Sequence, residues 1–370
     1  MQTINYITYD AWWDTDKTIL PTLTKEFKLN IFVLSPPENK KYPHKELYGS
    51  TFFYEGEQRV RDRDPRCFFD AIKIFWKILT RGNRKDDLYW LMPGYNPFLM
   101  AFLLIFLPQK HTIITYHDYT PHYYEEKVNL KNLNEWLFAR IKRGMCKKFR
   151  KFLFFSNLQK RNFDKDYISK CSVVCNMPLK DFGPLRQDSY TGRRFLFFGA
   201  IQEYKRLDLY IKAADMLDDC DAEFIIAGRP IINWNELEKI IVNKDRFRCD
   251  VHFIDDNKVA DYFAESDFLV LPYTDSTQSG PLLIALNYGI PVIATNIPAF
   301  SEFITDGENG FLFERGNVED LKKCFIRALA MNDEQYVNMK ITQEKKRAEY
   351  IATTDITKAL KTLIYDKICN

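Results

Sequence analysis

The feature that most constrains the fold of this chain is a regular alternation of short apolar runs with amphipathic helical segments. Helical periodicity is clearest at residues 205–217 and 317–331. The alternation predicts parallel sheets covered by helices, and therefore an α/β fold. We expect strands in the first half at residues 2–8, 30–35, 88–92, 111–116, 152–156 and 171–174, and in the second half at 194–199, 222–227, 248–254, 267–271 and 291–295.

The chain is long enough for two such domains, because 370 residues exceed what one hydrophobic core usually serves. Residues 177–194 are rich in Pro, Gly, Ser and charged residues, which predicts a linker. We therefore expect a first domain at 1–180, a linker at 181–193, a second domain at 194–350 and a terminal segment at 351–370. Two facing α/β domains would leave a cleft at the carboxyl ends of their strands, where open parallel sheets bind ligands.

Composition excludes several classes of protein. A hydrophobic share of 46% excludes a disordered chain, and a net charge of +3 does not favour a nucleic-acid partner. The eight cysteines are scattered, and the close pair Cys171 and Cys175 lacks zinc-finger spacing, so we expect reduced cysteines and a cytoplasmic protein. The N-terminus has no secretory pattern. The most apolar run, 97–107, is about half the roughly 20 residues that span a bilayer, so it predicts a core helix.

A polar loop runs directly into an apolar helix in "DSTQSGPLLIALNYGIPVIAT", residues 275–295. Pro281 suits the first helical turn, and either Ser279 or Gly280 would cap it. Free backbone N–H groups at this helix start, with the hydroxyls of Thr277 and Ser279, would form a site for an anion such as phosphate. An ordinary capped helix explains the stretch equally well.

A second loop places cations beside a helix start. In "FLFFGAIQEYKRLDLYIKAAD" a predicted strand ends at Gly199, which allows a ligand close to the backbone, and Lys205 and Arg206 follow. Cations at a helix N-terminus oppose the helix dipole, so they fit an anionic ligand better than helix stability. For Arg206, a solvated surface position is an equal alternative.

These segments resemble the GT-B glycosyltransferases, and within them the retaining family-4 enzymes, the glycosyl transferases group 1. The resemblance rests on "FFGAIQEYKRLDLYIKAAD", "FIIAGRP" and the segment from "VADYF" to "GFLF", and is most specific in the second half. It implies two Rossmann-like domains, with the last helix crossing back to the first. It also implies metal-independent transfer of a sugar with retained configuration and without a cofactor. The donor would be a nucleotide-sugar on the second domain, and the acceptor a glycan or polyprenyl-diphosphate-linked glycan on the first. The role implied is bacterial surface polysaccharide assembly.

Residue by residue, Lys205 matches the family lysine that neutralises the donor diphosphate. The arginine common after the strand glycine is replaced by Ala200, and the family's two glutamates align with Ser276 and Ile284, so this chain resembles a divergent member. Asp275 is a candidate replacement for the first glutamate. The resemblance assigns the diphosphate to Gly199, Lys205, Arg206, Thr277, Gln278, Ser279 and Gly280, the sugar or ribose to Asp275, Ser276 and Glu302, and the base to Gly228, Arg229 and Ile254.

The first half supplies further candidates at predicted strand ends. In "HTIITYHDYTPHYYEE", His117 resembles the family's catalytic cleft histidine, with Asp118 orienting it or touching the acceptor, although a structural loop histidine is an alternative. With His122 these residues fit no strong zinc template, so no metal is expected. Trp12 and Trp13 in "YDAWWDTD" would stack on an acceptor sugar or pack over the sheet.

Two questions stay open at the level of sequence. "FARIKRGMCKKFRKF", residues 138–152, fits either a surface helix drawn to anionic lipids on the inner face of the membrane or a solvated helix. The missing glutamates also leave open a catalytically silent sugar-nucleotide or glycan binder. A GT-B sugar-nucleotide epimerase is a third alternative.

Overall fold

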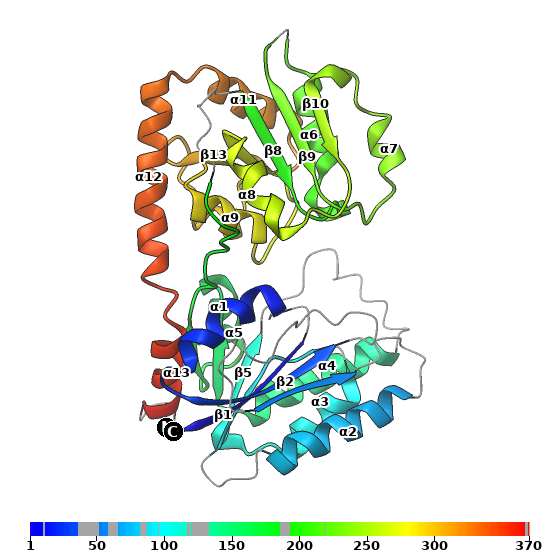
Figure 1. Ribbon diagram of the computed structural model, residues 1–370, viewed down its shortest axis with the longest axis vertical. Coiled ribbons are helices and arrows are strands. Elements are labelled where there is room, and N and C mark those ends of the chain that lie inside the picture. Colours follow the sequence, from blue (N-terminus) through cyan, green and yellow to red (C-terminus); the bar gives the residue numbers. More distant parts are fainter. Residues whose placement is uncertain are drawn as a thin grey trace. The chain divides into compact units, whose positions relative to one another are not determined.

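The computed structural model describes residues 1–9, 12–35, 52–57, 66–81, 87–94, 96–116, 119, 133–185, 193–218, 220–366 and 369. The chain forms two compact units, coloured mainly blue to green and green to orange in Figure 1. Unit 1 consists of Met1–Pro121, Glu125–Pro178 and Thr353–Asn370, and unit 2 of His122–Tyr124 and Leu179–Ala352.

Unit 1 is built on a parallel sheet of seven strands in the order β3-β2-β1-β4-β5-β6-β7. Its central strands are buried along almost their whole length, as expected when helices cover both faces of a parallel sheet. The strands are β1 (Thr3–Tyr9), β2 (Lys28–Ser35), β3 (Phe52–Glu57), β4 (Leu88–Leu91), β5 (Thr112–Tyr116), β6 (Lys151–Phe154) and β7 (Cys171–Val174).

The helices of unit 1 include one from the far end of the chain. The helix α13 (Ile356–Tyr365) packs against β6, β7 and α1. Asn96 caps α3, since its side-chain oxygen accepts hydrogen bonds from the backbone N–H groups of Phe98 and Leu99. The remaining helices are α1 (Trp13–Leu23), α2 (Arg66–Arg81), α3 (Pro97–Phe106), η3 (Gln109–His111), α4 (Leu133–Lys148) and α5 (Asn157–Asp166).

Unit 2 repeats this architecture with a parallel sheet of six strands, in the order β10-β9-β8-β11-β12-β13. The strands are β8 (Arg194–Phe198), β9 (Glu223–Ala227), β10 (Phe247–Asp250), β11 (Phe268–Leu271), β12 (Val292–Thr295) and β13 (Gly310–Phe313). The helices are η5 (Glu203–Lys205), α6 (Leu207–Asp215), α7 (Trp234–Glu238), η6 (Lys244–Arg246), α8 (Asp256–Ala264), α9 (Gly280–Tyr288), α10 (Pro298–Ser301), α11 (Val318–Leu329) and α12 (Asp333–Ile351).

The prediction of two parallel-sheet α/β domains is confirmed, and each predicted strand is present with small shifts of its bounds. Two strands were not predicted. β3 carries Glu55, Gly56 and Glu57 at the edge of its sheet, and β13 is a four-residue edge strand. β3 has no continuous apolar run, because part of the surface of an edge strand faces solvent. β13 is apolar, with the sequence GFLF, but only four residues long.

The predicted core helix at residues 97–107 is present as α3, which packs into the core through Leu99, Met100 and Leu103, although Phe98, Ile105 and Phe106 are exposed. The prediction for the cysteines is wrong. The cysteines are not all reduced, since Cys171 at the start of β7 forms a disulfide with Cys369 near the C-terminus, with their Cα atoms 5.2 Å apart. The two positions are 198 residues apart, so local spacing could not reveal the pairing.

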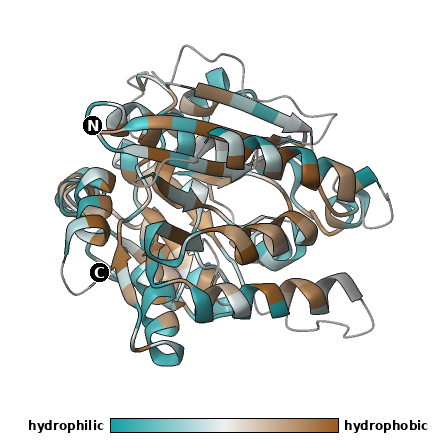
Figure 2. Cartoon of the chain, turned by 90° about the horizontal axis from the view of Figure 1, so that it is seen from below, coloured by the Kyte–Doolittle hydropathy of each residue, from teal (hydrophilic) through white to brown (hydrophobic). Residues whose placement is uncertain are grey.

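The basic run at residues 138–152 is not one surface helix either. α4 ends at Lys148, and Lys151, only 3% exposed, begins the central strand β6. Colouring by hydropathy shows helices in which apolar and polar segments alternate, the pattern of one face against a sheet and one toward water (Figure 2). Among the described residues, no helix is both long and apolar enough to cross a bilayer.

Candidate functional site

In unit 2 the order of the strands defines a switch point between β8 and β11. From β8 the chain continues to β9 on one side, and from β11 it continues to β12 on the other. The loops after β8 and β11 therefore diverge, and in sheets of this kind ligands bind at the carboxyl ends of those two strands. Gly199 follows β8, and Tyr273 to Ser279 follow β11.

Gly199 lies where three parts of unit 2 meet. It has a φ of +102°, and a Cβ there would lie 3.4 Å from Nζ of Lys205 and 3.5 Å from Cγ of Pro281 in α9. Gly228, at the end of β9, packs so tightly that a Cβ on it would lie 2.0 Å from the carbonyl oxygen of Gly199. Both positions thus require glycine, and the backbone of Gly199 stays accessible between a lysine and a helix start.

Lys205 is the cation of this site. Its side chain is 7% exposed and lies in η5, with Nζ 5.4 Å from the centre of the Tyr273 ring. No carboxylate among the described residues pairs with it, and burial lowers the pKa of its ammonium group from 10.5 to about 8. A buried lysine without a counter-ion destabilises the ligand-free protein. Ionisable groups with pKa values shifted in this way are common at functional sites.

The start of α9 lies beside that lysine. Ser279 is the N-cap and accepts a hydrogen bond from the backbone N–H of Leu282 (3.3 Å), with Pro281 in the first turn. Of the two predicted caps, Ser279 is therefore the correct one. Ser276, Thr277 and Ser279 are buried. The site thus combines a buried ammonium group with the positive end of a helix dipole, an arrangement suited to an anion.

Sequence reasoning missed two residues of this site. Nζ of Lys180 lies 3.4 Å from the position that a Cβ on Gly280 would occupy, so a second ammonium group reaches the start of α9. Tyr273 packs against the rings of Tyr204 and Phe300, with centroids 5.6 Å apart in each pair. Lys180 is one of many charged residues near the linker, and Tyr273 follows an apolar strand by two residues, so neither position carried a distinguishing signal.

Other predicted donor residues lie in unit 2 with different surroundings. The guanidinium of Arg206, a residue with φ of +50°, is bound by the carboxylate of Asp208 through contacts of 2.8 and 2.9 Å. The backbone N–H of Ser276 donates to the carboxylate of Asp275, and its hydroxyl donates to the carbonyl of Gln278. Glu302 is exposed at the end of α10. The site therefore brings Lys205, Gly199 and the α9 turn together, and Arg206 is already paired.

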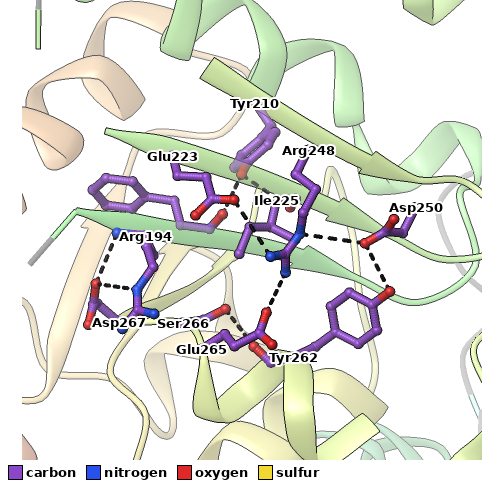
Figure 3. Close-up of polar contacts among 11 residues, drawn as sticks. Arg194, Tyr210, Glu223, Ile225, Arg248, Asp250, Tyr262, Glu265, Ser266 and Asp267 are labelled. Atoms are coloured by element: carbon purple, nitrogen blue, oxygen red, sulfur yellow. Dashed lines mark hydrogen bonds and ion pairs between the residues drawn. The ribbon is translucent and has the colours of Figure 1, made fainter. Parts of the chain in front are cut away.

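The residues predicted for the base are positioned by β9 and β10. The carbonyl of Arg229 accepts a hydrogen bond from the backbone N–H of Ile201 (2.9 Å), which ties the loops after β8 and β9 together. Ile254 is half-buried between β10 and α8. Figure 3 shows the charged network that joins this strand and helix: Arg248 contacts Glu223, Asp250 and Glu265, and Tyr262 donates to Asp250.

The predicted catalytic residues His117 and Asp118 of unit 1 lie outside the described residues, as does His122. Trp12 is half-buried against the core, and the side chain of Trp13 is outside the description. No sequence motif singles out Asp16, whose fully buried carboxylate accepts hydrogen bonds from Tyr6 (2.5 Å) and Thr8 (2.8 Å). This carboxylate fastens α1 to β1.

Two further features bear on ligands. The described residues contain no group of three or more His, Cys, Asp or Glu side chains arranged to hold a metal ion. A hollow of about 520 Å³ lies at the carboxyl ends of β12 and β13, lined by Asn296–Pro298, Leu312–Arg315 and Asp320. None of the residues predicted for the donor lines this hollow, so we base the site on the geometry around Lys205.

Each sheet is doubly wound, and solved structures define the particular fold. A glycosyltransferase from Rickettsia africae ESF-5 matches with a TM-score of 0.70 over 99% of this chain and 98% of its own, at 14% identity. HepE from Anabaena, solved in complex with UDP, matches with a TM-score of 0.68 over 98% and 100%, at 13% identity. The chain therefore has the GT-B fold.

The family follows from the sequence of unit 2. Residues 192–331 match the family described as glycosyl transferases group 1, so this unit carries a group 1 glycosyltransferase domain. An uncharacterised glycosyltransferase of Haemophilus influenzae is 29% identical over 40% of this chain and 42% of its own length. The O-antigen chain mannosyltransferase RfbU of Salmonella typhimurium is 26% identical over 62% and 67%. The match thus spans less than half of the Haemophilus protein.

Proposed function

We propose that this chain is a retaining, metal-independent glycosyltransferase that moves a hexose from a nucleotide-sugar to a glycan or lipid-linked glycan in bacterial surface polysaccharide assembly. The group 1 domain supports sugar transfer. The relative RfbU, named as an O-antigen chain mannosyltransferase, supports a polysaccharide acceptor. HepE, solved with UDP, supports a nucleotide as the donor's leaving group.

The observation that carries the proposal is the buried ammonium group of Lys205. It is 7% exposed, lies beside Gly199 and the start of α9, and has no carboxylate partner among the described residues. Burial of an unpaired charge destabilises the folded chain. A nucleoside diphosphate would supply the missing negative charge and would also accept hydrogen bonds from the α9 turn, so binding converts an unfavourable charge into a favourable pair.

The proposed chemistry needs little beyond this charge. The bond between the anomeric carbon and the diphosphate oxygen breaks, Lys205 and the N–H groups from Thr277 to Gly280 stabilise the departing diphosphate, and the sugar becomes oxocarbenium-like. The acceptor hydroxyl attacks from the face of the leaving group, and its proton passes to a phosphate oxygen. The products are a nucleoside diphosphate and a glycoside with retained configuration.

The other predicted residues have subsidiary roles in this proposal. His117 and Asp118 would line the donor sugar or the acceptor, and Trp12 and Trp13 would contact the acceptor. Glu302, Asp275 and Ser276 would meet the sugar or ribose, and Gly228, Arg229 and Ile254 the base. Because Arg206 is engaged by Asp208, the proposal depends on Lys205 as the cation of the diphosphate.

The decisive experiment incubates the protein with UDP-, GDP- and dTDP-sugars and with polyprenyl-diphosphate-linked acceptors, in the presence of EDTA. Nucleotide release and product mass are followed, and NMR gives the anomeric configuration. Release that requires the acceptor, with retention, is expected. Donor loss without acceptor would indicate an epimerase instead, and inversion of configuration or dependence on added Mg²⁺ would contradict the stated mechanism.

A second candidate is a sugar-nucleotide binder without turnover. It is favoured by Ile284, which aligns with a family glutamate and is 4% exposed inside α9, where it cannot accept a hydrogen bond from a ribose. In the same experiment a binder would be protected against thermal unfolding by a nucleotide-sugar but would release no nucleotide with any acceptor.

A further inference from the structure

The outer surface of α2 and α3 in unit 1 is apolar to an extent that packing within the chain does not explain. α3 has the sequence PFLMAFLLIF, without one charged or hydrogen-bonding side chain, although only part of it is buried. Its neighbour α2 adds exposed aromatic rings. We call this surface the α2–α3 aromatic face, consisting of Phe68, Phe69, Trp76, Phe98, Ile105 and Phe106.

The exposure of these side chains is high for their size. Phe69 and Trp76 are 69% and 61% exposed, and Ile105 and Phe106 are 65% and 57% exposed. Large apolar side chains scattered singly on a surface need no explanation, but a contiguous group of them marks an interaction site. Rings of this group meet across the two helices, because Phe68 of α2 packs edge-on against Phe98 of α3, with ring centroids 5.4 Å apart, and also against Phe69, at 5.9 Å. The two helices lie side by side.

The same helices are positively charged. α2 has four basic residues against one acidic residue, and α4, which packs on the other side of α3, has five against one. Their combined surplus exceeds the net +3 of the whole chain, so positive charge is concentrated around the α2–α3 aromatic face. On α2, exposed Lys73 lies between Phe69 and Trp76 in the sequence, one helical turn from each.

Aromatic rings surrounded by lysine and arginine fit the headgroup region of a membrane that contains anionic lipid. Phe and Trp bury their rings at the boundary between headgroups and acyl chains, and the basic side chains pair with lipid phosphates. A second copy of the chain fits less well, because a two-fold contact through this face would bring its basic residues against each other.

We infer that the α2–α3 aromatic face is a docking surface for anionic membranes, by which unit 1 binds the bilayer peripherally. The sequence offered residues 138–152 as one candidate for this contact, with a solvated helix as the alternative. The structure moves its apolar part to α2 and α3, with α4 supplying charge and the exposed Trp136, whose ring stacks with Arg140 at 4.7 Å. The inference does not depend on sugar transfer, since it concerns a surface without donor residues.

The test is sedimentation of the full chain with vesicles of phosphatidylcholine and phosphatidylglycerol, compared with vesicles of phosphatidylcholine alone. The double variant Phe69→Ser/Trp76→Ser should reduce the bound fraction at limiting lipid roughly tenfold or more, because it removes two rings that would be buried. Lys73→Glu should weaken binding to the anionic vesicles by at least about fivefold. Ile168→Ser, which changes an apolar side chain of unit 1 that is 93% exposed, is the matched control.

Each outcome decides the proposal. Loss of vesicle binding in the Phe69/Trp76 and Lys73 variants, but not in the Ile168 control, supports it. It is overturned by equal binding of all variants, by no preference for anionic vesicles, or by a concentration-dependent dimer that only the Phe69/Trp76 variant abolishes. Circular dichroism checks that the variants are folded, which is expected because the changed side chains are exposed.

Discussion

The switch points of the two sheets differ in how their charges are balanced. Unit 1 and unit 2 are wound in the same order, so β1 and β4 in one correspond to β8 and β11 in the other. In unit 1 the position is filled by an aromatic ring: a Cβ on Gly94 would lie 1.9 Å from Cζ of Tyr9. In unit 2 it holds the ammonium group of Lys205 without a carboxylate partner.

The two units also differ in whether their buried charged group, Asp16 or Lys205, has hydrogen-bond partners among the described residues of the fold. Asp16 in unit 1 is completely buried but accepts hydrogen bonds from Tyr6 and Thr8, so its charge is compensated within the fold. Together with burial, its carboxylate raises the pKa of Tyr6 well above the ordinary value. Lys205 is nearly as buried and lacks such compensation. The same topology thus holds a hydrogen-bonded carboxylate in unit 1 and an ammonium group in unit 2 that we propose binds the diphosphate.

The largest effect is expected for Lys205→Met. Nucleotide-sugar turnover should fall about a hundredfold or more, because a preorganised charge on the leaving group is removed. The ligand-free protein should become more stable by up to about 3 kcal/mol at pH 7, since the pKa of Lys205 is lowered from 10.5 to about 8 and each unit corresponds to about 1.4 kcal/mol. Urea denaturation measures the stability and steady-state kinetics measure the turnover. Lys212→Met, at an exposed lysine, is the control. A Lys205→Met protein that is less stable than the wild type would contradict the unfavourable burial of this charge.

Asp16→Ala should lower the stability of the protein and leave ligand binding unchanged, the reverse of the expectation for Lys205→Met. Removing this carboxylate leaves the hydroxyls of Tyr6 and Thr8 buried without their acceptor, which should lower the free energy of unfolding by about 2–4 kcal/mol. Affinity for UDP, measured by calorimetry at a temperature where the variant is folded, should not change. Asp221→Ala, at a side chain that is 90% exposed, is the control and should be nearly neutral. An Asp16 variant with normal stability would remove the contrast between the two units.

The pH dependence should separate binding from stability. Lys205 has a lowered pKa of about 8 in the folded protein, so its contribution to diphosphate affinity should be complete near pH 7, about halved at pH 8 and reduced about tenfold by pH 9. Between pH 8 and 10.5 the unfolded chain retains the proton that the folded chain has lost, so this group makes stability rise with pH. Lys205→Arg should bind UDP with a flat profile over this range, because arginine stays charged. A parallel fall in both proteins would exclude Lys205 as the titrating group.

The smallest effect is expected for Lys180→Ala. This ammonium group reaches the start of α9 but follows the last residues of unit 1 in the sequence, so it adds to a site already charged by Lys205. We expect UDP affinity to fall about three- to tenfold, the scale of one partly solvated ion pair. Lys239→Ala, in the same unit, is a matched control. If the Lys180 variant binds UDP normally, Lys205 is the only lysine of the two that contacts the diphosphate.

Local sequence was sufficient for features set by local chemistry. Apolar runs predict the parallel strands, and the Ser-Gly-Pro sequence predicts the capped start of α9. The glycine after β8, Gly199, stands out in the sequence, and it has a positive φ that favours glycine. Local sequence was not sufficient to show which charged side chains pair or which faces stay exposed. Arg206 pairs with Asp208 two residues away, Lys180 reaches α9 from outside any motif, and the apolar run of α3 gives no sign that one of its faces is exposed.

The disulfide between Cys171 and Cys369 has a topological consequence. The chain leaves unit 1 after Pro178 and re-enters it at Thr353, so the main part of unit 2, Leu179–Ala352, is an insertion between the two bridged cysteines. The disulfide closes a covalent ring that contains this insertion. A protease that cuts the chain once within Leu179–Ala352 would therefore produce two fragments that migrate as a single molecule until a reducing agent opens the ring.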